Sequence, residues 1–234
     1  MRPGAERNDM IGQTKKPLRE ILEFLEGKER VVIWGCGGCA SVFGTGGRRE
    51  VRQLAEALSQ HGKEVVAAVG VPPGEFTCHA PSLWERLKGY KEELKACQAV
   101  VVLACGDGLQ VLQETLEEGF GLSRPVYPGV NTQGLMGGGP VSFQEKCRQC
   151  GECLLGEFAG ICPLTRCPKG LLNGPCGGAK DGKCEVDRGL DCAWLSIYQR
   201  LKVLGKLEGL TRAPLFKDYA KEKRPRSLKV GQEG

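Results

Sequence analysis

Eight cysteines lie within the 46 residues from Cys147 to Cys192, and this density constrains the fold more than any other feature of the sequence. The same segment is rich in glycine and proline and poor in periodic apolar pattern, so we expect it to bury too little apolar surface to fold alone. Bound metal would then supply the missing folding free energy. The eight are Cys147, Cys150, Cys153, Cys162, Cys167, Cys176, Cys184 and Cys192.

The cysteines are interpreted as metal ligands, not as a disulfide framework. The N-terminus, MRPGAERNDM, lacks the charged-then-apolar pattern of a secretory signal, and no apolar run approaches the roughly 20 residues of a membrane span. The total of thirteen cysteines is odd, so at least one thiol stays unpaired. We therefore expect a soluble, cytoplasmic chain whose thiols remain reduced and free to bind metal.

The opening motif, CRQCGEC, indicates which metal. Three thiolates, each separated by two residues, can wrap around one cubane, as in bacterial ferredoxins, whereas zinc sites more often use two separated C-x-x-C pairs. Cys162 and Cys167 are each followed by proline, as at the edges of ferredoxin clusters. Eight thiolates predict two [4Fe–4S] clusters. One cluster plus zinc, or zinc alone, remain as alternatives, and the spacing does not pair sulfurs with clusters.

The first 140 residues alternate short apolar strands with amphipathic helices. Strands that are apolar throughout and separated by helices predict a parallel sheet covered on both faces. Ser82 and Glu85 predict a capping box at the start of one helix. Strands are expected at 31–34, 65–69, 99–104 and 126–130, and helices at 17–27, around 51–58, 82–94, 109–119 and 194–204.

The fold class is therefore α/β: a Rossmann-like (flavodoxin-like) parallel-sheet domain, followed by a cysteine-rich iron–sulfur segment and a C-terminal helix with a tail. The expected divisions are an N-terminal extension at 1–15, the Rossmann-like domain at 16–140, the cysteine-rich segment with its helix at 141–211, and a basic tail at 212–234. The tail favours a flexible or partner-docking end over nucleic-acid binding, because no aromatic residues form a stacking platform beside its charges.

The loop after the first strand, residues 35–40, fits G-x-G-x-x-A, which is typical of a dinucleotide site. The second strand ends at Val69 and Gly70 without an acidic residue for a ribose, and glycines at 44–47 delay the next helix. An NAD(P)-dependent enzyme is therefore disfavoured. The glycines can instead bring cysteine sulfurs close to the backbone.

Four further cysteines follow the strands of the predicted sheet. Loops after parallel strands emerge at one edge, so these thiols are expected to converge there. They predict a third metal site, either another [4Fe–4S] cluster or a zinc ion, and the alternative is that two of them are small buried residues. His79, beside one of them, is a further conceivable ligand. The four are Cys36, Cys39, Cys78 and Cys105.

The segment from Cys147 onward resembles a known family. The phrase N-G-P-C-G-G at Asn173–Gly178, with C-A-W at Cys192–Trp194 before a tyrosine-containing helix, is similar to the iron–sulfur small subunit, or C-terminal domain, associated with methylenetetrahydrofolate reductases of acetogens and other anaerobes. The N-terminal stretches KPLREIL, GCGGC and ACGDG resemble the same family. All eight cysteines of the segment match its cluster pattern.

This resemblance implies a role in the one-carbon metabolism of acetogens, the Wood–Ljungdahl pathway. The chain would dock to a flavin-containing TIM-barrel catalytic subunit and relay electrons to its flavin from an upstream electron donor protein. It would be non-catalytic and show no turnover alone. The alternative function is a structural zinc-binding module that tethers partners without a redox role.

Overall fold

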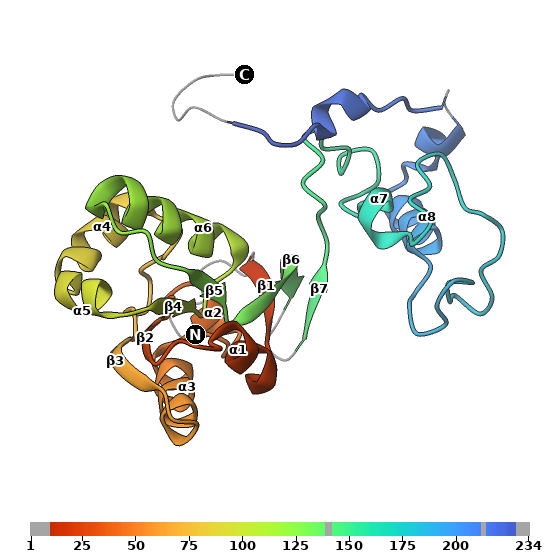
Figure 1. Ribbon diagram of the computed structural model, residues 1–234. Coiled ribbons are helices and arrows are strands. Elements are labelled where there is room, and N and C mark those ends of the chain that lie inside the picture. The colour runs from red at the N-terminus through yellow and green to blue at the C-terminus, as the bar shows by residue number, and fades with distance from the viewer. Residues whose placement is uncertain (1–9, 139–141, 212–213, 228–234) are drawn as a thin grey trace, which may run out of the picture. The chain divides into compact units, whose positions relative to one another are not determined.

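The computed structural model describes residues 10–138, 142–211 and 214–227 (Figure 1). The chain divides into two compact units, Met1–Gly134 and Leu135–Gly234, called here the sheet unit and the cysteine unit. Strand β6 (Val130–Gly138) spans the division. Each unit is described by itself. Within the described residues, none of the helices has the length and apolar character needed to cross a membrane.

The sheet unit is built on four parallel strands in the order β3-β2-β4-β5. Counting only these four, the order is 2-1-3-4. The central strands are short runs of β-branched residues that are buried on both faces, as a sheet covered by helices requires. The strands are β2 (Arg30–Trp34), β3 (Glu64–Val69), β4 (Ala99–Val102) and β5 (Val126–Pro128).

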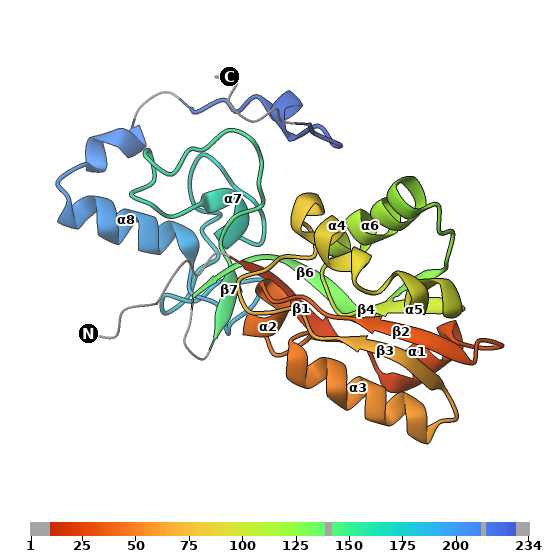
Figure 2. The same ribbon diagram turned by 90° about the vertical axis from the view of Figure 1, so that its left-hand side faces the viewer.

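Helices cover both faces of the sheet (Figure 2). Alternate residues of β2 and β4 belong to the cores on the two faces. One face packs against α1 (Leu18–Phe24) and α3 (Arg48–Gln60) through a core that includes Val31, Ile33 and Leu58. The other face packs against α4 (Ala80–Lys88), α5 (Lys91–Ala96) and α6 (Gly106–Glu114), through a core that includes Trp34 and Leu112. A π-helical turn, Thr115–Gly119, continues α6.

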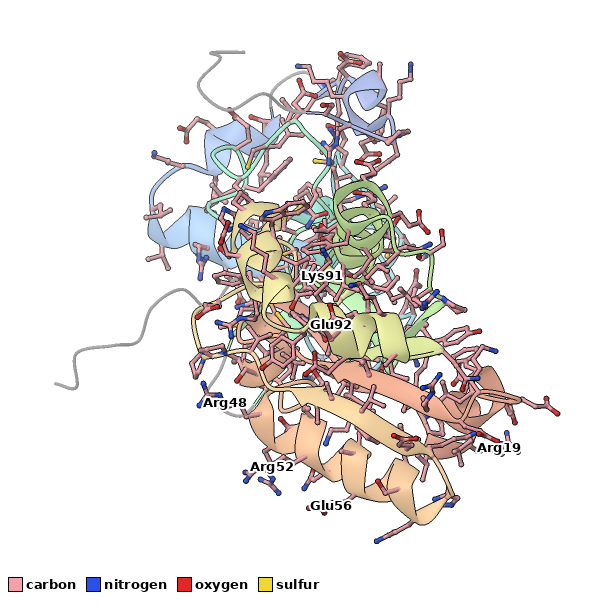
Figure 3. The ribbon with its side chains drawn as sticks, turned by 60° about the vertical axis from the view of Figure 1, so that its left-hand side comes forward. Arg19, Arg48, Arg52, Glu56, Lys91 and Glu92 are labelled. Atoms are coloured by element: carbon pink, nitrogen blue, oxygen red, sulfur yellow. The ribbon has the colours of Figure 1, made fainter. Side chains whose placement is uncertain are left out.

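Helix α3 shows how patterning places a helix on the sheet. Val51 and Leu58 lie seven residues apart on one face and are buried, whereas Arg52 and Glu56 are exposed. Figure 3 shows Arg52 and Glu56 pointing away from the strands. The helix ends just before Gly62, whose φ of 76° suits glycine. The predicted helix around 51–58 is confirmed.

The predicted capping box is wrong. Helix α4 begins at Ala80, with His79 as its N-cap and Pro81 in its first turn, so Ser82 lies inside the helix. The Ser82 hydroxyl contacts His79 Nδ1 at 2.5 Å, and Glu85 forms an ion pair with Lys88 instead of reaching back. The expected single helix over 82–94 is also two helices, interrupted at Gly89 and Tyr90.

A second, three-stranded sheet was not expected from the sequence. Its order is β1-β6-β7, with β1 (Met10–Lys15) in the stretch predicted as an extension. In the sheet unit, Gln133 of β6 donates to Thr14 of β1 at 3.1 Å. In the cysteine unit, the end of β6 pairs antiparallel with β7 (Phe143–Glu145).

The cysteine unit has a small apolar core of its own. Phe158, Trp194, Ile197 and Leu201 are buried together, with the Phe158 and Trp194 rings edge to face at 5.5 Å between centroids. The Trp194 indole donates to the Leu171 carbonyl at 3.0 Å. The helices are α7 (Pro163–Arg166), α8 (Ala193–Val203) and the 3₁₀ turns η2 (Leu207–Thr211) and η3 (Tyr219–Glu222).

Candidate metal centres

The eight thiols of the cysteine unit divide between two cavities, four at each. The first cavity has a volume of about 190 Å³. It lies between the C-x-x-C-x-x-C loop and the start of α7, and further residues of these two segments line it. Its cysteines are Cys147, Cys150, Cys153 and Cys162.

The second cavity is smaller, about 20 Å³, and lies between the loops that precede α8 and the first turn of that helix. Ala193 and Trp194 form part of its wall. The sequence spacing left the partition of the sulfurs open, whereas the cavities group them four and four. The cysteines of the second cavity are Cys167, Cys176, Cys184 and Cys192.

Tight turns shape the first group, named here the loop quartet. Gln149 and Gly151 both have positive φ, 58° and 82°, and these turns reverse the chain between successive thiols. The Gln149 N–H donates to Cys147 Sγ at 3.3 Å, while the Cys150 thiol donates to the Glu152 carbonyl at 3.2 Å. A backbone N–H aimed at sulfur is the kind of contact that stabilises a thiolate cluster.

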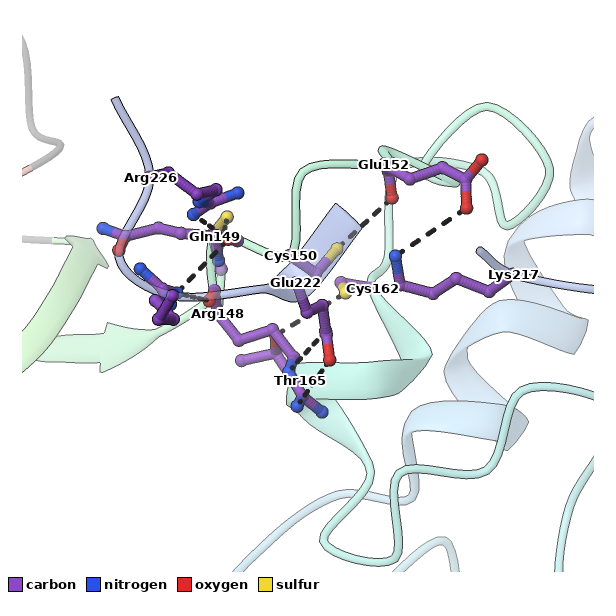
Figure 4. A network of polar contacts seen from close by, with 11 residues as sticks. Arg148, Gln149, Cys150, Glu152, Cys162, Thr165, Lys217, Glu222 and Arg226 are labelled. Carbon is purple, nitrogen blue, oxygen red and sulfur yellow. Dashed lines mark hydrogen bonds and ion pairs between the residues drawn. The ribbon is translucent and has the colours of Figure 1, made fainter. Parts of the chain in front are cut away.

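The C-terminal tail packs against this loop, so the expectation of a free, flexible end is wrong for residues 217–226. Glu152 is the acceptor: Lys221 Nζ lies 2.9 Å and Lys217 Nζ 3.8 Å from its carboxylate, and the Asp218 N–H donates to it at 2.8 Å. Lys221, the Asp218 N–H and Lys217 together lower the pKa of Glu152. Figure 4 shows the Lys217–Glu152 contact beside Cys150 and Cys162.

Arginines complete the contact between tail and loop (Figure 4). Arg226 donates to the Gln149 carbonyl at 2.5 Å, and Arg148 forms an ion pair with Glu222 at 3.2 Å. A Cβ on Gly151 would lie 2.7 Å from the Lys221 carbonyl oxygen, so the approach requires glycine there. The tail thereby brings several cations to the loop quartet, where an anionic cluster would need them. Sequence reasoning missed these contacts because 65 to 77 residues separate the partners.

Backbone and ionic contacts order the second group, named here the α8 quartet. The N–H groups of Cys184 and Cys192 donate to the carbonyls of Leu190 and Gly182 at 2.9 and 2.8 Å. Cys192 is the N-cap of α8. Hydrogen bonds from the Lys169 ammonium and then the Cys176 thiol lower the pKa of Glu185.

Four thiols of the sheet unit lie in the three loops that follow β2, β3 and β4, and they are named here the edge quartet. Cys36 and Cys105 are buried, Cys39 is half-buried and Cys78 is exposed. Partial burial raises the pKa of Cys78 to about 11, and the thiolate charges of Cys105, Cys36 and Cys39 also raise it. The convergence of the four sulfurs on one metal stays a prediction.

Glycines make the approach of these loops possible. A Cβ on Gly37 would lie 1.7 Å from the Pro72 carbonyl oxygen, and one on Gly38 would lie 2.4 Å from the Phe76 ring. The G-x-G-x-x-A glycines are thus used to pack the loop after β3 against the loop after β2. Helix α2 (Cys39–Val42), which opens there, has only four residues.

The remaining cysteine of the sheet unit and the conceivable ligand His79 have other contacts. Cys97 is buried before β4, at the edge opposite the edge quartet, and its thiol donates to the Leu94 carbonyl at 3.3 Å. His79 contacts Ser82 through Nδ1. Across residues 10–138, 142–211 and 214–227, no group of three or more His, Cys, Asp or Glu side chains is arranged around a single-ion position. The ligand assignments therefore remain predictions.

Comparison with known proteins bears on the cysteine unit. Residues 127–220 match the family described as methylene-tetrahydrofolate reductase C terminal, and all cysteines of the loop and α8 quartets lie inside that range. The resemblance seen in the sequence is confirmed over this range, whereas the edge quartet lies outside it. No curated protein and no solved structure matches the chain.

Proposed function

We propose, from the membership of residues 127–220 in the methylenetetrahydrofolate reductase C-terminal family, that the chain is the electron-transfer iron–sulfur subunit of such a reductase. The observation that carries the proposal is the division of eight thiols into two groups of four within the matched range. Four cysteine ligands are the complement of one [4Fe–4S] cluster. Such clusters, when bound, accept and donate single electrons.

We assign the first cluster to the loop quartet and the second to the α8 quartet. The donor set fits, because each quartet offers four sulfur ligands around one cavity and contains no competing histidine. The role of the protein is to hold the thiolates in place. The Gln149 N–H donates to the Cys147 sulfur, and Arg148, Lys217 and Lys221 screen the negative charge of the loop quartet. These contacts support the binding of a metal cluster by the thiolates.

The flavin and the folate are assigned to a partner. The sheet unit has four parallel strands, with an order that supports a flavodoxin-like fold, whereas a TIM barrel needs eight. The partner would be the flavin-containing catalytic subunit of the reductase, and an upstream electron donor protein would supply this chain. Alone, the chain should reduce no methylenetetrahydrofolate; turnover by the flavoprotein-free chain would contradict the proposal.

The rival function is a structural zinc module that tethers partners. Anaerobic purification with analysis of iron, sulfide and zinc separates the two functions. The electron-transfer proposal expects about eight iron atoms per chain from the two quartets and visible absorbance that bleaches with dithionite. Zinc in place of iron in both quartets, with no bleaching, would replace the proposal with the rival.

Variants test the pairing of sulfurs with clusters. Cys150→Ala should lose the loop-quartet cluster, and Cys176→Ala the α8-quartet cluster, about four iron atoms each. The double variant should lose both. Cys97→Ala is the matched control, because Cys97 lies in neither quartet, and it should keep full iron. If Cys150→Ala and Cys162→Ala removed different clusters, the pairing would be wrong.

Partner docking is tested separately. The full chain, co-expressed with the flavin subunit, should co-purify with it, and the isolated chain should contain no flavin. The tail was expected to help hold that partner. Because the tail also contacts the loop quartet, its deletion would change both properties, so exposed Phe216→Ala is the cleaner test. Weaker co-purification with unchanged iron would support docking by the tail.

A further inference from the structure

The parallel sheet places four cysteines in the loops at the carboxyl ends of its strands, whereas Cys97 lies at the opposite edge. Ligands of open α/β sheets bind outside the carboxyl ends of the strands, at the point where the strand order reverses. In the order β3-β2-β4-β5 that point lies between β2 and β4. Cys36 and Cys39 follow β2, and Cys105 follows β4, so three thiols flank this position. Cys78 comes from the loop after β3.

The three loops contact one another through small residues. The Thr77 hydroxyl donates to the Gly35 carbonyl at 2.8 Å, which joins the loop after β3 to the loop after β2. A Cβ on Gly108, in the first turn of α6, would lie 3.4 Å from Thr77 Cβ and 3.6 Å from Cys78 N. The segment bearing Cys78 thus lies against both neighbouring loops. The packing fixes the backbone positions from which the four thiols extend.

We propose that Cys36, Cys39, Cys78 and Cys105 form a third metal centre, a four-thiolate site that holds a [4Fe–4S] cluster. The assignment rests on the placement of the four cysteines on three loops that contact one another at one edge of the sheet. Four soft thiolates and no carboxylate among them select iron–sulfur clusters or zinc over hard cations. The site lies in the sheet unit and outside residues 127–220, so it does not rest on the proposed function.

A cubane suits the edge quartet better than one zinc ion. Four sulfurs around a single zinc must approach one another closely, because each lies only about 2.3 Å from the ion. The sulfur ligands of a cubane stand farther apart, which leaves more room for thiols that come from three separate loops. The exposed Cys78 also places one ligand at the surface, where a cluster can be inserted and where electrons can enter.

The test uses the full chain, purified anaerobically, with iron, sulfide and zinc measured per chain. Cys36→Ala/Cys39→Ala should lose about four iron atoms, which is about a third of the total if both quartets of the cysteine unit are filled. Cys78→Ala changes an exposed residue, spares the core and should lose the same iron. Cys97→Ala is the control, a buried thiol at the opposite edge that should keep all iron.

The outcomes separate this site from the proposed function. Iron lost from the edge variants but retained on Cys150→Ala and Cys176→Ala would support this site and reject the cysteine-unit clusters. Iron and zinc both at wild-type level in Cys78→Ala would overturn the edge site. A loss of about one zinc with unchanged iron would overturn the cluster and identify a zinc ion on the same four ligands. Circular dichroism of each variant confirms that the sheet remains folded.

Discussion

The two units of this chain are stabilised in different ways. The sheet unit buries apolar side chains on both faces of a parallel sheet, with Val31, Val101 and Leu112 fully inaccessible to solvent. The cysteine unit buries one small cluster around Trp194 and otherwise consists of turns, short bridges and thiols. A large apolar core folds without help, whereas a small one usually needs metal or disulfide cross-links. The sheet unit should therefore be most sensitive to substitutions in its core, and the cysteine unit to loss of metal.

Removal of metal should produce the largest difference in stability between the two units. Anaerobic chelation of iron should unfold the loops at 142–192, because their thiols supply most of the interactions there. The amides of β2, β3 and β4 should keep their protection, including after loss of the edge-quartet cluster. Hydrogen exchange measured by mass spectrometry resolves both regions. Persistent protection of 142–192 in the iron-free chain would show that the two units do not differ in this way.

A substitution in the apolar core should instead destabilise the sheet unit and leave the cysteine unit unchanged. Leu112→Ala removes a fully buried side chain from the sheet unit and should lower its free energy of unfolding by about 2–5 kcal/mol. The iron held by the loop and α8 quartets should not change. Guanidinium unfolding followed by far-ultraviolet circular dichroism measures the loss. Leu204→Ala, at a residue 55% exposed, is the control and should cost less than about 0.5 kcal/mol.

A smaller effect tests the core of the cysteine unit. Trp194→Phe keeps most of the ring but removes the donor to the Leu171 carbonyl, leaving that oxygen without this bond. The iron-loaded unit should lose about 1 kcal/mol of stability. Unfolding of the anaerobic protein, followed by release of iron, measures it. Stability equal to wild type would show that the metal alone orders the unit.

The smallest expected effect concerns the tail. Glu152→Gln weakens the ion pairs with Lys221 and Lys217 at the protein surface and should cost little stability. Amides at 217–226 should exchange faster while iron content stays constant. Glu92→Gln removes a similar surface pair, with Lys95, in the sheet unit and should leave the tail unchanged. Equal exchange in both variants would mean that Glu152 does not hold the tail.

Sequence periodicity was sufficient to predict the central parallel strands and α3 of the sheet unit, because these elements follow local rules. The apolar strands β2 and β4 and the amphipathic α3 were predicted close to their observed bounds. The capping box failed because Pro81 and His79 start α4 earlier than Ser82. Strands β1 and β6 were not predicted because they pair across more than 100 residues. They also carry no strong alternation of apolar and polar residues, as the exposed stretch 131–133 shows.

The ligand sets of the cysteine unit were predictable as residues but not as groups, whereas the edge quartet was predicted as a group from the strand pattern. Cysteine spacing and the C-x-x-C-x-x-C motif predict metal binding, yet they carry no information on which loops of the cysteine unit come together. The partition into loop and α8 quartets depends on the path of the chain through α7. The contacts of the tail with the loop join residues 65 to 77 positions apart. Local patterns do not reach that far.

The packing of the tail on the loop quartet also sets an order of events during synthesis. Gln149 leaves the ribosome 77 residues before Arg226, the residue that contacts it. At about 5–20 residues per second, that interval lasts roughly 4–15 s. During this time the three thiols of the loop are complete while their covering segment has not yet been made. The proposed ligands of the first cluster would thus be accessible to cluster-assembly machinery before translation ends.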